Sequence, residues 1–388
     1  MKKIIQLLIF SYSLVFPQNG IISGFISDSS SGEALIGANV IIQETGQGMA
    51  TDINGYYIIQ NINPGEYTLM VSYVGFRLSR EKVTVSSDQS IKKNIEMVED
   101  FVELTQIDVT AEKLQRRNNI QPSKINLSPR MMKAAPALAE PDLFRTIQAL
   151  PGVLTTSEYS TGLVIRGGNT DQNLIMLDGI TVYNPSHLGG IFSNFIVDGV
   201  KEAELIKGAY NAEYGGRLSA VLNVISREGN QKEFKGKANI SLLSAQTTLE
   251  GPLPKGAWIL SGRRTYFDLV LPRVLPDNIA SNVPPYFFYD VQGHIFSDIS
   301  TKDRLSLSYY TGIDDIVFDT FGLDGRWGNR TISGHWRRVF SERLVGNFLI
   351  ANSNFRTFFG LGGDGGLVND NIIDDRTISA DLSWFKSA

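Results

Sequence analysis

The sequence lacks cysteine altogether and has only three histidines among its 388 residues. The absence of cysteine excludes a disulfide scaffold, a thiol nucleophile, a thiolate metal site and a lipid anchor of the lipoprotein type. His187, His294 and His335 are scattered, with no second ligand at metal-binding spacing, and we interpret each as incidental. With 36 basic and 40 acidic residues, neither charge is in excess, so no nucleic-acid partner is indicated.

No stretch of the chain reaches 18 consecutive apolar residues, so the sequence predicts no transmembrane helix. Lys2 and Lys3 precede a mainly apolar segment at 4–16, which is typical of a signal peptide and too short to span a bilayer. We predict a signal peptide at 1–18; a buried first helix is the alternative. The chain is rich in glycine, with 37 residues, which suits a β-rich protein, and a membrane role would have to use a β-barrel.

Short alternating segments between turn signals predict a β-sandwich at residues 19–98. Strands are expected at 39–42 and 65–74. Asn54-Gly55 predicts a hairpin between 51–53 and 56–59, because both turn positions tolerate positive φ. Asp52 and Asn54 resemble the start of a calcium loop, but glycine follows Asn54 at once and no glutamate stands at loop position 12, so a turn is favoured.

Residues 120–228 predict a small mixed α/β domain. Pro141 to Leu150 places its apolar residues on one helical face, between prolines at 141 and 151. A second short helix is expected near 193–201. The expected strands are 162–166, 173–177, 202–207 and 219–226.

The short sequence motifs of this domain resemble those of a known family. Leu-Val-Ile-Arg-Gly-Gly, Ile-Met-Leu-Asp-Gly-Ile, Ala-Glu-Leu-Ile-Lys-Gly and Tyr-Gly-Gly follow one another within 162–229. This order resembles the plug domain of TonB-dependent receptors of the Gram-negative outer membrane, although Ala209 stands where many relatives have proline. The matching plug positions are Gly167, Asp178, Gly179, Gly208, Tyr214 and Gly215. The segments 31–40, 51–57 and 64–69 resemble the carboxypeptidase regulatory-like domain, which often precedes such a plug.

The resemblance also implies roles for charged residues of the plug. Arg166, Glu204 and Lys207 match family positions that face opposite charges on the barrel wall. An ion pair of this kind holds the plug yet can be released, since an exposed pair contributes only about 0–1 kcal/mol. The alternative is that the three are solvated charges at strand ends.

A short extended segment lies between the sandwich and the plug, within the linker 99–119. In the family, a segment here is the TonB box, which pairs edge to edge with a strand of TonB through backbone hydrogen bonds. A plain linker strand is the alternative. The expected TonB contacts are Thr105, Gln106, Ile107, Asp108, Val109 and Thr110.

From residue 229 onward, apolar and polar residues alternate in strand after strand, which is typical of a transmembrane barrel with its apolar face outward. A soluble all-β domain would explain any single strand equally well. A glycine- and aspartate-rich loop is expected at 360–371. The seven expected strands are 236–250, 256–270, 286–299, 305–310, 331–340, 344–356 and 378–384.

Seven strands cannot enclose a plug, since plugged transporters use about 22 strands. We therefore expect an N-terminal fragment of a longer receptor, with a truncated barrel at 229–388 that leaves an open sheet edge.

The predicted fold class is mainly β: a β-sandwich, an α/β plug, then the first strands of an incomplete transmembrane barrel. The predicted function is a TonB-dependent importer of an unidentified ligand in the outer membrane, with TonB, that ligand and membrane lipid as partners and no cofactor or metal. The sequence shows no nucleophile–base pair and no phosphate loop, so we predict that the protein is not an enzyme. The alternative is a periplasmic or surface binding protein that uses the sandwich.

Overall fold

The computed structural model describes residues 19–87, 89–100, 124–135, 140–157, 160–276, 285–318, 322–341, 344–362 and 366–384. The predicted signal peptide and the predicted TonB-contact segment at 105–110 lie outside the described residues. The chain divides into one unit that extends up to Asn118 and a second from Asn119 to Trp384. In the described ranges, no helix has the length and apolar character needed to cross a membrane.

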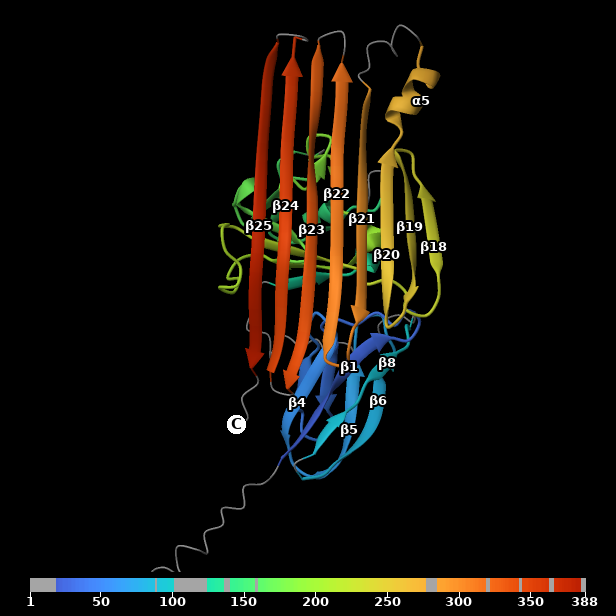
Figure 1. The fold of residues 1–388 in the computed structure, drawn as a ribbon, viewed down its shortest axis with the longest axis vertical. Helices are drawn as coiled ribbons and strands as arrows, with labels where there is room; N and C mark the ends of the chain where they lie inside the picture. Colours follow the sequence, from blue (N-terminus) through green and yellow to red (C-terminus); the bar gives the residue numbers. More distant parts are fainter. Residues whose placement is uncertain are drawn as a thin grey trace, which may run out of the picture. The chain divides into compact units, whose positions relative to one another are not determined.

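The N-terminal unit is the predicted β-sandwich (Figure 1). One sheet has the order β4-β1-β7 with β8 also paired to β1, and the other has the order β3-β2-β5-β6. The strands are β1 (Gly20–Asp28), β2 (Asn39–Ile42), β3 (Gly48–Ala50), β4 (Tyr56–Ile62), β5 (Gly65–Ser72), β6 (Ser79–Val85), β7 (Ser90–Lys92) and β8 (Ile95–Met97).

Period-two alternation builds the core of this sandwich. Ile22 and Ile26 of β1 are completely buried, as are Leu69 and Val71 of β5 in the other sheet. All four belong to one apolar cluster. Because successive side chains of a strand point to opposite faces, each strand contributes every second residue to this core.

The predicted turn at Asn54-Gly55 is confirmed, but the predicted hairpin between 51–53 and 56–59 is wrong. Asp52 Oδ1 accepts hydrogen bonds from the amides of Asn54 and Tyr56, both at 2.8 Å, and Gly55 has φ +72°. The strands on either side do not pair with each other: β3 pairs with β2, whereas β4 pairs with β1. The turn therefore carries the chain from one sheet of the sandwich to the other.

The second unit begins with the α/β plug. Its main sheet has the order β13-β12-β17-β16-β9. The predicted second helix is a single 3₁₀ turn, η2. The elements are β9 (Lys124–Leu127), α3 (Pro129–Ala134), α4 (Leu143–Gln148), β10 (Val153–Thr155), β11 (Leu163–Ile165), η1 (Thr170–Gln172), β12 (Leu174–Leu177), β13 (Ile180–Thr181), β14 (Ser186–His187), β15 (Phe192–Ser193), η2 (Val197–Gly199), β16 (Val200–Ile206) and β17 (Val221–Ser226).

The predicted plug helix is confirmed as α4. Asp142 caps it, since its Oδ1 accepts a hydrogen bond from the amide of Arg145 at 3.0 Å. Leu143, Phe144 and Ile147 are buried in the plug core. The cap and the apolar face together fix the start of the helix and the side that packs.

The described strands after the plug form one antiparallel sheet in sequence order, from β18 to β25 (Figure 1). The sheet has eight strands instead of the seven predicted, because the segment 236–250 is a hairpin whose apolar turn at 241–243 conceals the break. The elements are β18 (Lys235–Ile240), β19 (Ser244–Leu253), β20 (Gly256–Thr265), α5 (Phe267–Val274), β21 (Tyr286–Asp298), β22 (Asp303–Phe318), β23 (Leu323–Ser341), β24 (Leu344–Leu361) and β25 (Leu367–Trp384).

Several strands are longer than predicted. β24 continues to Leu361 and β25 begins at Leu367, so most of the loop expected at 360–371 is strand. In these extensions the apolar residues come in adjacent pairs, Phe358-Phe359, Leu367-Val368 and Ile372-Ile373, so they show no apolar alternation, while the backbone ladder continues.

Alternation divides the sheet into an outer apolar face and an inner polar face, as predicted. On β22, Leu305 and Leu307 are 46% and 47% exposed, whereas Ser308 and Tyr310 are buried. Tyr310 joins the plug core, so the inner face is the one that the plug covers. The mainly β fold class is confirmed.

We predict that truncating the sandwich core lowers its stability by an amount that depends on burial. Ile42→Ala removes a completely buried side chain and should lower the free energy of unfolding by roughly 2–5 kcal/mol. Ile53→Ala, at a position 55% exposed, should change it by less than about 1 kcal/mol. Denaturant unfolding of the N-terminal unit, followed by circular dichroism, measures both; equal losses would contradict the packing described.

Candidate functional site at the contact between plug and barrel wall

The plug meets the inner face of the barrel sheet mainly through charged and polar side chains. The centre of this contact is His187 on β14. Its Nδ1 lies 2.7 Å from Asp314 Oδ2 and its Nε2 lies 2.8 Å from Asp290 Oδ1, and the imidazole is completely buried. The ring stacks on Phe288 with centroids 4.1 Å apart. One plug residue thus joins strands β21 and β22.

Arg263 of β20 extends the network across the same interface. Its Nε and Nη2 donate to Asp290 Oδ2 at 2.8 and 2.5 Å. Its Nη1 donates to Glu140 Oε1 of the plug at 2.7 Å, and Nη2 also donates to the carbonyl of Ser193 at 2.7 Å. Glu140 in turn accepts from Gln246 of β19 at 2.6 Å. Arg263 therefore has partners on both the plug and the wall.

Two tyrosines of the wall complete the central network. The hydroxyl of Tyr286 donates to Asp314, and that of Tyr310 donates to Asp290 Oδ1 at 3.0 Å. The backbone amide of Leu188 donates to Asp314 Oδ1 at 2.9 Å. Buried charges are tolerated when hydrogen bonds satisfy them, and breaking such a set is far costlier than breaking a surface pair.

The environment of His187 favours its charged form. Burial by itself would lower the pKa of His187, but the adjacent carboxylates of Asp290 and Asp314 raise it above its ordinary value. With His187 protonated, the network holds two cations, His187 and Arg263, against three carboxylates, Asp290, Asp314 and Glu140. Loss of the histidine proton would leave Arg263 as the only cation in this set.

A second ionic contact involves Asp198 in η2. Lys133 of the plug lies 2.6 Å from its carboxylate, and Lys237 of β18 lies 2.7 Å from it. Asn239 donates to the same carboxylate at 3.0 Å. Burial would raise the pKa of Asp198, but the hydrogen bonds from Lys133 and Lys237 bring it below its usual range. The plug is thereby tied to the first strand of the sheet.

Further bridges extend towards both ends of the sheet. Arg227, after β17, pairs with Glu250 of β19 at 2.7 Å. At the other end, the hydroxyl of Tyr183 donates to Asp375 of β25 at 3.0 Å. Ser353 of β24 donates to the carbonyl of Thr181 at 2.7 Å. The polar contact thus extends from β18 to β25.

The three predicted plug–wall charges lie elsewhere in the plug. Glu204 of β16 pairs with Lys124 of β9, and Lys207 Nζ donates to the carbonyl of Pro151 at 2.8 Å. Arg166 follows β11 with φ +48°. The partners described for Glu204 and Lys207 therefore belong to the plug. That the three residues face charges on the barrel wall stays a prediction.

The predicted plug motif marks turns and packing. Asp178 has φ +51°, and its Oδ1 and Oδ2 accept from the amide and hydroxyl of Ser226 at 2.8 and 2.7 Å. Tyr214 packs against an apolar cluster of β12, β16 and β17. Positive φ values of 83°, 80° and 114° occur at Gly167, Gly179 and Gly208; Gly215 lies beside Gly216, whose φ is also positive.

The interpretation of His187 as incidental is wrong. In the described part of the chain, no group of three or more His, Cys, Asp and Glu side chains could hold a metal ion, so its role is that of a cation between two carboxylates. Strand alternation does place Arg263, Asp290 and Asp314 on the inner face. Asp290 and Asp314 pair with His187, which is more than 100 positions away in the sequence. No local sequence signal could predict such a pairing.

We predict that Arg263 supports the plug far more than its sequence neighbour Arg264. Arg263→Met leaves Glu140 buried without its cation and Asp290 with His187 alone, and should destabilise the plug by roughly 3–5 kcal/mol. Arg264 pairs with Asp268 of the following helix at a partly exposed site away from the plug network, so Arg264→Met should cost less than about 1 kcal/mol. Because the chain lacks cysteine, a fluorophore on Leu218→Cys, a highly exposed plug position, can report plug unfolding in urea.

We also predict that plug stability falls as pH rises above about 6.5, the ordinary pKa of histidine. Since His187 has a raised pKa in the folded state, its contribution is complete below the unfolded pKa and is lost as pH rises through the folded pKa. The urea midpoint measured against pH should lose this fall in His187→Gln and keep it in His335→Gln. An unchanged profile in His187→Gln would exclude the histidine as its source.

Comparison with known proteins agrees with this architecture. Residues 22–109 match the CarboxypepD_reg-like domain, and residues 127–221 match the TonB-dependent Receptor Plug Domain. Over 237 residues the chain is 24% identical to the TonB-dependent transporter Oar of Myxococcus xanthus. This match covers 58% of the present chain and 22% of Oar. Over 235 residues the chain is 31% identical to a TonB-dependent receptor of Formosa agariphila. This match covers 57% of the present chain and 22% of that receptor.

A solved structure shares the fold of the plug and barrel strands. A mutant of the ferric enterobactin receptor PfeA from Pseudomonas aeruginosa superposes with a TM-score of 0.52 and 17% identity over 70% of this chain and 47% of that chain. The present chain spans 22% of the length of each curated relative. The chain thus has the regulatory-like domain, the plug domain and the barrel strands of TonB-dependent receptors of the outer membrane, in this order.

Proposed function

We propose that this protein is a TonB-dependent importer, in which the plug closes the barrel until TonB pulls it. The observation that supports this proposal is the chemistry of the plug–wall contact. Its centre is a network of His187, Arg263 and three carboxylates. Such a contact holds the plug in a defined position while every group in it can be satisfied by water once the plug moves.

The energetics favour this view over permanent packing. An apolar interface resists separation by about 25 cal/mol for each Å² exposed to water, with no compensation. Ion pairs and hydrogen bonds instead exchange partner for partner with water, so their net contribution is far smaller than their strength in a dry site. The plug is therefore retained by many exchangeable contacts, and a pulling force can break them in sequence.

The proposed energy source is TonB, bound at residues 105–110. This segment lies just before the boundary between the two units at Asn118, where a pull would act on the plug unit first. The segment alternates Ile107 and Val109 with polar residues, which suits a strand added to the edge of another sheet. We infer a transport role and not catalysis, in line with the relatives named as receptors and transporters.

A proline substitution tests the coupling segment. In β-augmentation the backbone of the segment supplies the hydrogen bonds, so Asp108→Pro should abolish binding of the periplasmic domain of TonB to the purified complete receptor. Asp108→Asn keeps the backbone amide and should leave binding within about twofold of the unmodified protein. Deletion of 105–110 should likewise stop energised uptake without affecting ligand binding at the cell surface.

Calorimetric titration of the TonB domain into each receptor variant measures the effect. Equal affinity of Asp108→Pro and Asp108→Asn would show that TonB does not pair with this strand. Unchanged uptake after the deletion would remove the segment from the coupling mechanism altogether.

A further inference from the structure

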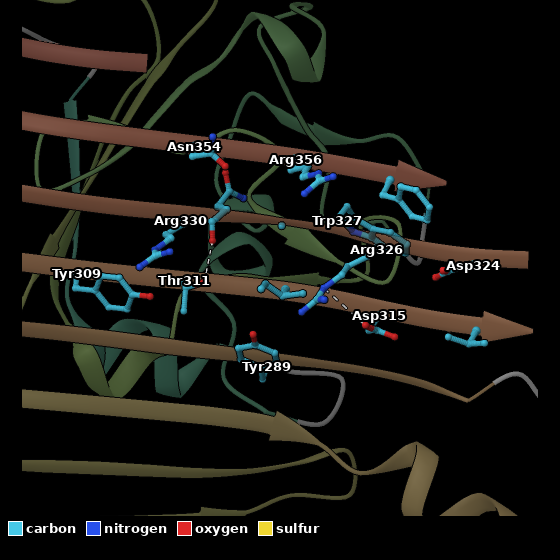
Figure 2. Close-up of a pocket in the computed structure, with 15 residues that line it drawn as sticks. Tyr289, Tyr309, Thr311, Asp315, Asp324, Arg326, Trp327, Arg330, Asn354 and Arg356 are labelled. Atoms are coloured by element: carbon cyan, nitrogen blue, oxygen red, sulfur yellow. Dashed lines mark hydrogen bonds and ion pairs between the residues drawn. The ribbon is translucent and has the colours of Figure 1, made fainter. Parts of the chain in front are cut away.

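A hollow of 790 Å³ lies on strands β21 to β24, on the face of the sheet opposite the plug (Figure 2). Its position follows from alternation. On β22, Tyr309, Thr311 and Asp315 line it, and they share the face of the exposed Leu305 and Leu307. The intervening Tyr310 and Asp314 contact the plug network on the inner face. The hollow is therefore outside the barrel wall and separate from the path that the plug blocks.

The hollow begins just above the apolar band of the outer face. Along β23, Trp336 and Ile332 are exposed apolar residues, and Arg330 is the next outward residue after Ile332. Tyr309 lies opposite Ile332 in the strand register. Two residues of a strand span roughly 7 Å, so Arg330 stands one step beyond Ile332, the last large exposed apolar residue of β23 in this direction. A change from apolar to charged outward residues is expected where the hydrocarbon core of the bilayer meets the lipid headgroups.

The connections between strands show which side of the membrane this is. At the end of the sheet nearest the hollow lie the connections 241–243, 266–285, 319–322 and 362–366, and 266–285 is by far the longest. At the other end lie 254–255, 299–302 and 342–343. Outer-membrane barrels have short periplasmic turns and longer external loops, so the hollow faces the outer leaflet.

The hollow offers cations that the protein itself uses only in part. The guanidinium of Arg330 lies 5.8 Å from the ring centroid of Tyr309 and has no carboxylate partner among the described residues. Arg326 Nε lies 3.7 Å from Asp315 Oδ2, a long contact for an ion pair at an exposed site. Arg356, by contrast, is held by Asp370 through two hydrogen bonds of 2.9 and 2.7 Å.

We propose that this hollow binds the phosphorylated sugar headgroup of an outer-leaflet glycolipid. Arg330 and Arg326 would contact the phosphate, because guanidinium groups form charge-assisted hydrogen bonds with phosphate oxygens. Tyr289, which also lines the hollow, would contact the sugar ring (Figure 2). The acyl chains would lie along Ile332 and Leu307 below. The inference depends on the proposed outer-membrane location, but not on import.

Native mass spectrometry of the complete receptor, titrated with diphosphoryl lipid A, tests the proposal. The double variant Arg326→Gln, Arg330→Gln should weaken binding about tenfold or more, since it removes both guanidinium donors. The matched control is Arg376→Gln on β25, an exposed arginine paired with Asp374, and it should change binding by less than about twofold. Circular dichroism of each variant checks that the barrel is intact.

Two further probes separate the sources of phosphate. Dephosphorylated lipid A should bind about tenfold more weakly than the diphosphoryl form. Equal binding of the two forms, or no loss in the double variant, would overturn the proposal. If inorganic phosphate competes as strongly as the lipid, the site takes a soluble anion and the lipid assignment is wrong. TonB binding by the same samples reports on the proposed function independently.

Discussion

One constraint governs the barrel part of this protein: each strand must serve two different environments with alternate residues. On β22, Leu305 and Leu307 face outward, while Tyr310 and Asp314 face the plug. The backbone ladder allows no residue to serve both sides. Because the outer face takes the apolar residues that lipid requires, the inner face carries most of the polar groups, and the contact with the plug combines hydrogen bonds and ion pairs with an aromatic cluster around Phe288.

The buried network around His187 follows from that constraint. Arg263 and Asp290 pair with each other within the wall, and each also pairs with a residue of the plug, Arg263 with Glu140 and Asp290 with His187. Removing any one member leaves another charge buried without its partner, which is costly. Moving the whole plug into a hydrated space exposes all of them to water together. The same groups therefore resist local disruption strongly and concerted displacement far less.

The sequence could predict what depends on neighbours in the chain, and it could not predict what depends on distant pairing. The Asn54-Gly55 turn, helix α4 and the alternation of β22 are local, and the structure has them. The pairing of β3 and β4 in different sheets and the position of His187 between two strands are decided by tertiary packing. The predicted strand lengths were wrong for a third reason: β24 and β25 continue where their apolar residues come in adjacent pairs and no longer alternate.

Alternation along β21 also brings the inner network and the outer hollow onto the same strand. Tyr289 lines the hollow, and its neighbour Asp290 binds His187 and Arg263 on the other face. Both residues lie within continuous ladders to β20 and β22, which fix the strand on either side. A headgroup bound outside can therefore stabilise the wall that the plug grips without reaching the plug itself. In this arrangement the lipid would set the rigidity of the wall, while displacement of the plug would depend on the inner network alone.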